Sequence, residues 1–200
     1  MEVFDQLAEK YQGEHSSNPF QAELTSRVGG LLPAGASVLD LGCGTGVPTA
    51  AILAESDHRV VGVDISEGML RLARTQVPTA EFVHADFAEL AEDFGTFDAV
   101  TAFFSLLMLS KARIESTLTK VAGWLKPGGY LAIGMVDFDA DSAPVEFLGV
   151  PVTVSGYREA DLEALLAAKG FEVVSIETVE FQPPGGPVES QIFALAQLPG

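Results

Sequence analysis

The sequence predicts a doubly wound α/β fold, in which helices cover both faces of a mostly parallel sheet. From residue 35 onward, short apolar segments alternate with segments of helical periodicity. Several of the apolar segments show little polar–apolar alternation, which is typical of parallel strands buried on both faces. A glycine cluster follows the first of these segments, where a strand would turn into a helix. The 200 residues suit one domain with a sizeable core.

Seven segments are predicted to be strands. They span residues 37–41, 59–64, 81–84, 97–103, 130–136, 171–181 and 188–198. The last two are joined by six residues, which is too short for a helical crossover, so we expect an antiparallel hairpin there. The expected architecture is a seven-stranded, Rossmann-like sheet that is parallel except at its C-terminal hairpin.

Two segments stand outside this alternation. Residues 1–34 are expected to form an N-terminal helical cap, because Asn18-Pro19 is a good helix start. Residues 137–156 form a long connection with prolines and glycines, and connections of this length are often lids or binding loops. We therefore expect one domain over 1–200, with its core at 35–136 and a final helix and hairpin at 157–200.

The charge excludes several classes of partner. The chain holds 28 acidic and 11 basic residues, for a net charge of −17. Such a chain repels nucleic acid and anionic membranes, whose binding depends on basic side chains. No uncharged apolar run approaches the roughly 18 residues of a membrane span. With a single cysteine and no signal-peptide pattern at the start of the chain, we expect a cytoplasmic protein.

Residues 38–46, V-L-D-L-G-C-G-T-G, are the most informative stretch. Glycines in a strand-to-helix turn permit positive φ and let the backbone approach a ligand closely. The dinucleotide fingerprint does not fit, because Val47 fills its third glycine position, and no lysine completes a phosphate loop. The turn therefore predicts a nucleotide-like ligand that is neither a dinucleotide nor a nucleoside triphosphate.

Three acidic residues refine this prediction. Asp40 enters the turn and suits a cationic group better than a pyrophosphate. Asp64 ends the second strand, where an acid binds both ribose hydroxyls. Asp86 follows the third strand, where a carboxylate can accept a hydrogen bond from an adenine amino group. The ligand has an adenosine, free hydroxyls, a positive charge and no phosphate, and S-adenosylmethionine has all four properties.

The sequence resembles the class I S-adenosylmethionine-dependent methyltransferases of the small-molecule type. The resemblance rests on five segments in the order and spacing of the family: 38–46, 60–64, 85–87, 97–100 and 125–129. It implies that the product is S-adenosylhomocysteine and that the turn approaches the methionine part of the cofactor through Gly42, Cys43, Gly44 and Gly46. It also implies that Asp40 approaches the amino group of the cofactor and that the Phe104 backbone lies near its amino-acid moiety.

The resemblance places the adenosine as well. Asp64 would hold the ribose, Ile65 and Met69 would flank the adenine ring, and Asp86 with the Phe87 backbone would read the adenine edge.

An N-terminal segment, F-D-x-x-A-x-x-Y at residues 4–11, resembles one that small-molecule members carry before the glycine motif. Phe4 departs from the tyrosine usual there. Tyr11 matches and would cover the cofactor near its methyl group. Tyr11 and His15 are the candidate catalytic residues, with His15 as a base.

The acceptor is expected to be a small molecule. The segment after the fourth strand, 103–106, lacks the Asn/Asp-Pro-Pro-aromatic motif of members that methylate nucleic-acid amines. The helical cap and residues 137–156 would form the pocket, with Tyr11, His15, Phe104, Asp137 and Tyr157 as candidates. An apolar lining, indicating an apolar or aromatic metabolite, would come from Phe104, Leu106, Leu107, Met108, Phe147, Leu148 and Val150.

Other interpretations stay open. A protein acceptor is one, and a cofactor-binding protein that transfers no methyl group, such as a cyclase or a structural subunit, is another. A nicotinamide-dependent oxidoreductase fits the glycine spacing poorly. We expect no metal site, a monomer or a homodimer, and structural roles for Cys43, His58, His84 and Trp124.

Overall fold

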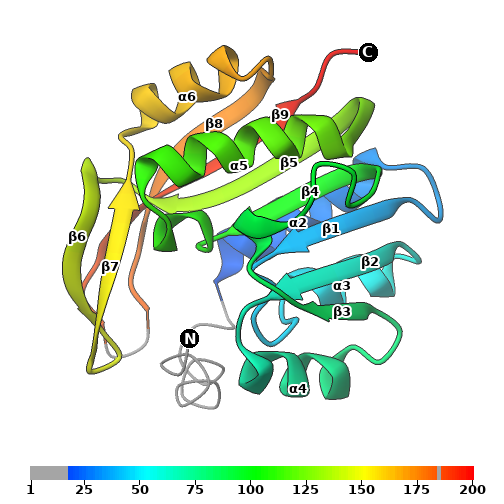
Figure 1. Ribbon diagram of the computed structural model, residues 1–200, viewed down its shortest axis with the longest axis horizontal. Helices are drawn as coiled ribbons and strands as arrows, with labels where there is room; N and C mark the ends of the chain where they lie inside the picture. Colours follow the sequence, from blue (N-terminus) through cyan, green and yellow to red (C-terminus); the bar gives the residue numbers. More distant parts are fainter. Residues whose placement is uncertain (1–17, 184–185) are drawn as a thin grey trace.

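The computed structural model describes residues 18–183 and 186–200. Its main sheet has seven strands in the order β3-β2-β1-β4-β5-β9-β8 (Figure 1). These strands are β1 (Ser37–Leu41), β2 (Arg59–Asp64), β3 (Glu81–His84), β4 (Phe97–Phe103), β5 (Leu125–Val136), β8 (Glu172–Phe181) and β9 (Glu189–Gln197). Strands β1 to β5 pair in parallel, and β9 runs antiparallel to both β5 and β8. The prediction of a doubly wound, Rossmann-like sheet is confirmed.

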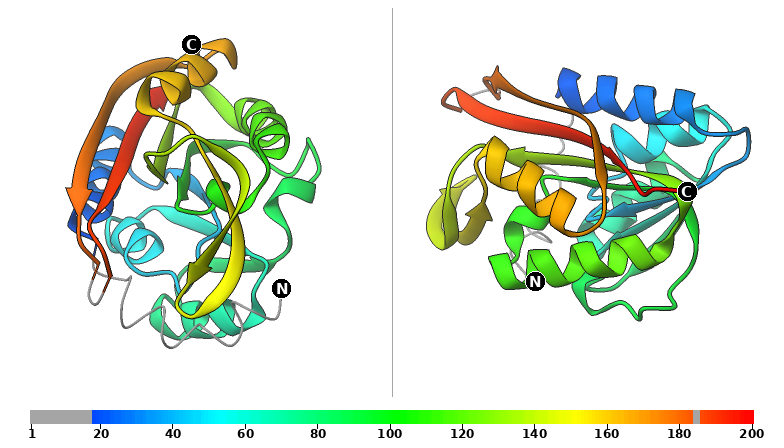
Figure 2. Two further views of the ribbon diagram at one scale, coloured as in Figure 1. Left: turned by 90° about the vertical axis from the view of Figure 1, so that its left-hand side faces the viewer. Right: turned by 90° about the horizontal axis from the view of Figure 1, so that it is seen from above.

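Helices cover both faces of the sheet. They are α2 (Pro19–Leu31), α3 (Thr49–Glu55), α4 (Glu67–Gln76), α5 (Lys111–Trp124) and α6 (Glu159–Ala168), with short 3₁₀ turns η1 (Phe87–Glu89) and η2 (Leu106–Met108). In Figure 2, α2 lies on one side of the sheet, and α5 and α6 lie on the other. No helix in the described ranges is long and apolar enough to cross a membrane.

The core is divided by the sheet into two clusters. Side chains from α2 and α3 pack on one face with Val38, Ala99 and Leu195. Side chains from α5 and α6 pack on the other with strand neighbours such as Leu39 and Val100. Successive strand residues point to opposite faces, so the continuous apolar runs in the sequence serve both clusters.

The segment 137–156 is not the irregular connection that we expected. Residues Ala140–Phe147 (β6) and Val150–Gly156 (β7) form a separate two-stranded antiparallel sheet. Leu148 and Gly149 both have positive φ, as in the tight two-residue turns that favour hairpins. Pro144 and Pro151 are tolerated because both strands of a hairpin are edge strands.

Helix α2 begins where the sequence predicted. Asn18 caps it, because its side-chain oxygen accepts hydrogen bonds from the backbone N–H groups of Phe20 and Gln21. The rest of the predicted helical cap, with Tyr11 and His15, lies outside the described residues. Strand β5 starts at Leu125 instead of Tyr130, because Leu125 already pairs with Phe97 ahead of an irregularity in the ladder.

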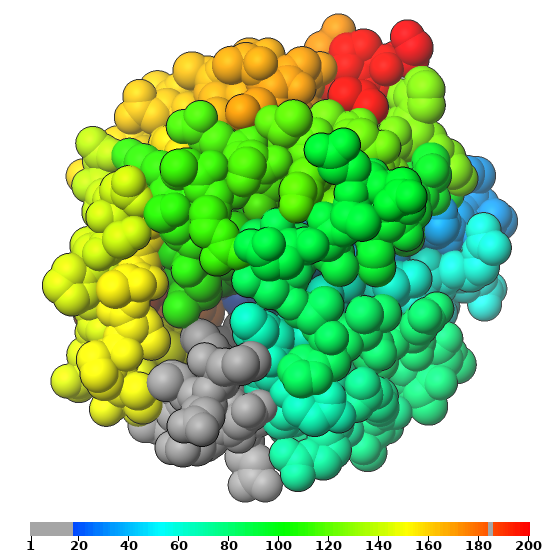
Figure 3. Space-filling view, viewed as in Figure 1, coloured from blue at the N-terminus to red at the C-terminus, as the bar shows by residue number. Residues whose placement is uncertain are grey.

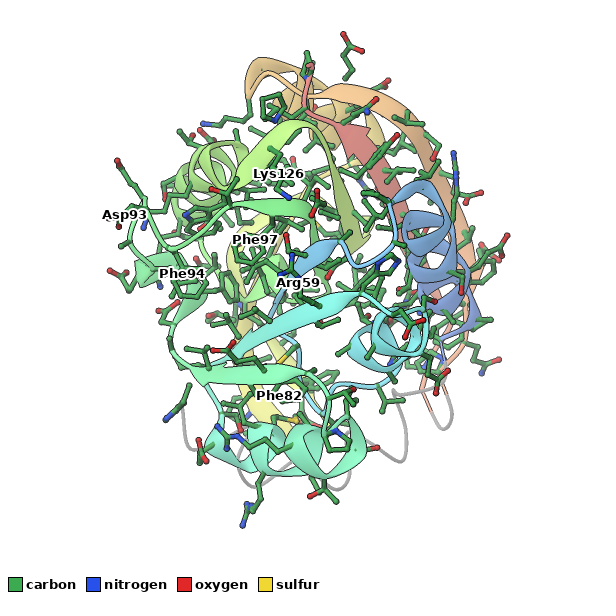
Figure 4. The ribbon with its side chains drawn as sticks, turned by 90° about the vertical axis from the view of Figure 1, so that its right-hand side faces the viewer. Arg59, Phe82, Asp93, Phe94, Phe97 and Lys126 are labelled. Atoms are coloured by element: carbon green, nitrogen blue, oxygen red, sulfur yellow. The ribbon has the colours of Figure 1, made fainter. Side chains whose placement is uncertain are left out.

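Asp98, near the start of β4, hydrogen-bonds to residues at the starts of β1 and β5. These amino ends of the strands lie on the side of the molecule that faces the viewer in Figure 4. The Asp98 carboxylate accepts hydrogen bonds from the backbone N–H and hydroxyl of Ser37 at 2.8 and 2.9 Å. It also accepts two from Lys126 Nζ at 2.8 Å each. Although partial burial opposes the shift, these bonds lower the pKa of Asp98.

We expect Asp98→Asn to lower the free energy of unfolding by about 1–2 kcal/mol at pH 7, because Lys126 and Ser37 lose a charged acceptor. Since the folded-state pKa lies below the unfolded value of about 3.9, the contribution is complete above that value and fades as the pH falls below it. Urea unfolding between pH 7 and pH 3 checks this. Asp93→Asn, at an exposed residue labelled in Figure 4, is the control. Equal effects of the two changes would contradict the anchoring role.

Candidate functional site

A cavity of about 440 Å³ opens at the carboxyl ends of the parallel strands. It runs from the glycine turn after β1 to the β6–β7 hairpin. Figure 3 shows the surface hollowed between the hairpin (yellow), the segment after β4 (green) and the α4 region. Its lining residues are Gly42, Gly44, Asp64, Ile65, Met69, Phe87, Phe103, Phe104, Ser105, Leu107, Met108, Val136, Phe138, Val145, Glu146, Phe147, Val152, Val154 and Glu189. Ligands of doubly wound sheets bind in this crevice outside the strand ends.

The glycine turn is shaped by backbone requirements. Gly42, Gly44 and Gly46 have φ values of +69°, +54° and +80°. The N–H groups of Gly42 and Cys43 both donate to the carbonyl of Val63, at 2.7 and 3.1 Å. A Cβ on Gly42 would lie 2.3 Å from the Cβ of Ser105, so no larger residue fits. Gly42 and Gly44 border the cavity, whereas Gly46 packs against Val77 and Ala73.

Asp64 stands at the cavity with both of its oxygens oriented by the backbone. Oδ2 accepts from the Gly44 N–H at 2.8 Å, and Oδ1 accepts from the Ser66 N–H at 2.9 Å. Burial raises the pKa of Asp64, and the backbone hydrogen bonds oppose the rise. A carboxylate oxygen can accept two hydrogen bonds, so each still has capacity for a hydroxyl group.

Apolar side chains line the cavity beside Asp64. Ile65 is 36% exposed and Met69 is buried at 3%, and both contribute to the lining. Phe87 joins them from the start of η1. An apolar surface next to a carboxylate with spare capacity to accept hydrogen bonds suits a flat ring attached to a sugar.

The side chain of Asp86 does not line this cavity. Its Oδ1 caps η1 by accepting from the Ala88 N–H at 2.9 Å, and its Oδ2 accepts from Arg113 Nη2 at 2.9 Å. Arg113 also contacts Glu89 at 2.8 Å. The structure therefore gives Asp86 a positioning role for Phe87 and leaves its predicted hydrogen bond to adenine a prediction.

Asp40 lies behind the turn in a second, small cavity of about 20 Å³, about the room of one water. Its Oδ1 accepts a hydrogen bond from Thr101 Oγ1 at 2.7 Å. Its Oδ2 is buried and has no hydrogen-bond partner among the described residues. Burial raises the pKa of Asp40 to about 7, and the charge of Asp64 adds to the rise. An unpaired buried oxygen at a ligand cavity suits a cationic donor.

Phe104 marks the end of β4 with a strained backbone. Its φ is +55°, and its N–H donates to the Gly134 carbonyl at 2.8 Å. Its ring packs edge-on against Phe193 at a centroid separation of 5.8 Å. The sequence placed Phe104 at the site, and it does line the cavity.

Some of the residues that were predicted to bind the acceptor line the cavity, and others do not. Leu107, Met108 and Phe147 line the cavity, as expected. The sequence missed the apolar lining residues Val136, Phe138, Val145, Val152 and Val154, the polar residue Ser105 and the acidic residues Glu146 and Glu189.

Five of the predicted acceptor residues do not line the cavity, namely Leu106, Asp137, Leu148, Val150 and Tyr157. Leu106 is packed in the core instead. Lys111 Nζ lies 4.6 Å from the ring centre of Tyr157, which is buried. Asp137 accepts from Arg158 Nη1 at 3.4 Å.

The residues expected to be structural are held by local contacts. Burial raises the pKa of the Cys43 thiol well above its ordinary value, which disfavours a thiolate. Ring nitrogens of His58 and His84 hydrogen-bond to the carbonyls of Gly29 and Ile65. Trp124 is fully buried. Among the described residues, no cluster of three or more His, Cys, Asp or Glu is arranged to hold a metal ion.

The profile of a protein family described as a methyltransferase domain matches residues 38–129. The O-methyltransferase rstn1 of Aspergillus nomiae is 31% identical over 171 residues, covering 78% of this chain and 74% of its own length. The chain belongs to the S-adenosylmethionine-dependent methyltransferases. The demethylmenaquinone methyltransferase of Clavibacter sepedonicus is 43% identical over 103 residues, which cover 50% of this methyltransferase and 41% of that relative.

A solved structure shares the fold of this methyltransferase. It is the 1,6-didemethyltoxoflavin-N1-methyltransferase of Burkholderia thailandensis with bound 1,6-didemethyltoxoflavin and S-adenosylhomocysteine. The two superpose with a TM-score of 0.67 at 24% identity, over 90% of this chain and 79% of the other.

The cofactor of this methyltransferase is S-adenosylmethionine, and the site fits it. The carboxylate of Asp64 suits the ribose hydroxyls, and Asp40, which lies behind the turn in the small cavity, would reach the ammonium group through a water or through the backbone of the turn. The slot between Ile65, Met69 and Phe87 suits the adenine ring.

We expect Gly42→Ala to lower the free energy of unfolding by about 1–3 kcal/mol, because the new Cβ collides with Ser105 at a positive φ. We also expect it to lower the affinity for S-adenosylhomocysteine at least about tenfold. Urea unfolding measures the stability, and calorimetric titration measures the affinity. Gly123→Ala in α5, where no atom lies within 4 Å of the new Cβ, is the control and should stabilise by about 0.5–1 kcal/mol. Unchanged binding in Gly42→Ala would contradict the role of the turn.

Asp40→Asn should change how the stability of the ligand-free protein depends on pH. Because the folded-state pKa of about 7 exceeds the unfolded value, the wild type loses stability as the pH rises from about 4 to 7. The neutral amide removes this loss, so at pH 8 the variant should be more stable by a few kcal/mol. Parallel pH dependences of unfolding for the two proteins would show that Asp40 ionises normally.

Proposed function

We propose that this protein transfers a methyl group from S-adenosylmethionine to a small-molecule acceptor by in-line displacement. The observation that carries the proposal is the continuity of the cavity, which joins the cofactor half at Asp64 to the apolar half under the hairpin. A donor and an acceptor can therefore meet inside one cavity.

Different residues of the chain would bind different parts of the cofactor. Gly42 and Gly44 would bring the turn against the methionine part, and Asp40 would reach its ammonium group through a water or through the backbone of the turn. Asp64 would hold the ribose, while Ile65 and Met69 would cover the adenine ring. Phe104, just past β4, would stand between the cofactor half and the acceptor half.

The cofactor supplies an activated methyl group on a sulfonium. The protein would then need to align the acceptor and exclude water, and orientation alone can provide about 7–11 kcal/mol of the barrier. The aromatic and branched side chains around the apolar half support such exclusion. A base is needed only where the acceptor must lose a proton, and Tyr11 and His15 remain the candidates from the sequence.

The chemistry of the cavity supports a small acceptor over a macromolecule. Its apolar half is lined by the hairpin, and a cavity of about 440 Å³ suits a small molecule. The net charge of −17 disfavours a nucleic-acid acceptor. A cytoplasmic location is part of the proposal. A protein acceptor and a non-methylating role are the competing interpretations.

The test uses S-adenosylmethionine labelled in its methyl group, incubated with the protein and a small-molecule extract of the source cells. We expect label in a new small molecule, and the loss of that product with Asp64→Ala, because the ribose contact is removed. Glu172→Gln, an exposed change at the far end of the sheet, should leave transfer intact.

The other outcomes separate the interpretations. Label in protein would identify a protein acceptor. Tight binding of S-adenosylhomocysteine without label in any fraction would support the non-methylating role.

A further inference from the structure

The acceptor half of the cavity is mostly apolar, and its lining includes two acidic residues, Glu146 and Glu189. Its aromatic residues are Phe103, Phe104, Phe138 and Phe147, and valines from both hairpin strands complete the wall. In the β6–β7 register, Val145 faces the same side as Val152. Glu146 pairs with Pro151, so it belongs to the opposite face by strand alternation. None of the described lining residues is a lysine, an arginine or a histidine.

Glu189 is the carboxylate that enters this wall, and two amides hold it in place. The Gln191 side chain, 4% exposed, donates from Nε2 to Glu189 Oε2 at 3.0 Å. The Gln191 oxygen accepts from Asn18 Nδ2 at 2.8 Å. Because Asn18 is fixed as the cap of α2, the orientation of the Gln191 amide is fixed, and its donor points to Glu189. The other oxygen, Glu189 Oε1, accepts no hydrogen bond from the described residues.

A second polar residue lies beside the same space. Ser105 lines the cavity against Gly42, where its two halves meet, and its hydroxyl oxygen is buried with no hydrogen-bond partner among the described residues. A half-satisfied carboxylate favours a partner that donates hydrogen bonds, whereas the Ser105 hydroxyl can donate or accept. A bound carboxylate would meet the charge of Glu189 and no cation in the described lining.

We infer that Glu189 selects the acceptor: an apolar, aromatic-sized molecule that carries a hydroxyl or an amine, and not one that carries a carboxylate. This inference rests on the proposed function, since it concerns the acceptor of that reaction. It adds a specificity-determining residue and a class of acceptor to the cofactor site.

The test measures binding of three matched probes to the protein saturated with S-adenosylhomocysteine. The probes are phenethylamine, 2-phenylethanol and 3-phenylpropionate, which share a phenyl ring and an ethylene spacer and differ in the polar group. Ligand-observed NMR titration gives their affinities. In the wild type, the amine and the alcohol should bind, and the carboxylate should bind at least about tenfold more weakly.

Glu189→Gln keeps the shape of the side chain and removes its charge. The substitution should lower the affinity for phenethylamine about tenfold and reduce the difference in affinity between the amine and the carboxylate. The affinity for S-adenosylhomocysteine should stay within about twofold, which would show that the fold is intact. Glu172→Gln removes one charge at the opposite end of the sheet, and it should change neither the affinity for phenethylamine nor the difference in affinity between the amine and the carboxylate.

Three results would overturn the inference and leave the proposed function standing: equal binding of the carboxylate and the amine to the wild type, equal effects of the two variants, or no binding of any probe to the loaded protein. Failure of S-adenosylhomocysteine to bind the wild type would overturn the proposed function, and the inference with it.

Discussion

The switch in strand order between the adjacent, parallel strands β1 and β4 is the constraint on which the rest of the site depends. The connection after β1 packs its helix on one face of the sheet, and the connection after β4 leads to α5 on the other face. The two connections therefore part at the strand ends and leave a crevice. At its floor, Gly42 and Ser105 touch so closely that a Cβ on residue 42 would collide. That contact sets the turn against the segment that carries Phe104, so the cofactor half and the acceptor half share one cavity.

Local signals in the sequence predicted most of the fold. The bounds of β1, β2, β3 and β4 agree with the prediction because each is an apolar segment closed by strong turn or capping residues. The β6–β7 hairpin was missed although Val150, Val152 and Val154 alternate with period two. Pro144 and Pro151 argued against strands there, and that rule holds only inside a sheet, not for a two-stranded hairpin.

The candidate site, like the fold, was predicted only in part from the sequence. Spacing along the chain predicted Gly42 and Asp64, and the resemblance to the family implied Ile65 and Met69; all four line the cavity. Glu189 was not predicted because it meets the cavity only through antiparallel pairing with distant strands. A faint signal existed, since Glu189 and Gln191 stand two apart at the start of an otherwise apolar strand. The partners of Asp86 depend on tertiary packing, because Arg113 arrives from α5, and no spacing rule reveals them.

The central claim is that one cavity receives the cofactor at Asp64 and the acceptor under the hairpin. Methyl-methionine NMR tests it directly, because Met69 lines the cofactor half, Met108 lines the acceptor half and Met135 is buried in the core. S-adenosylhomocysteine should shift the Met69 methyl signal, and phenethylamine added next should shift that of Met108, with Met135 unchanged. Leucine substitutions assign the signals. A cofactor effect on Met135 alone, or displacement of S-adenosylhomocysteine by phenethylamine, would contradict the account.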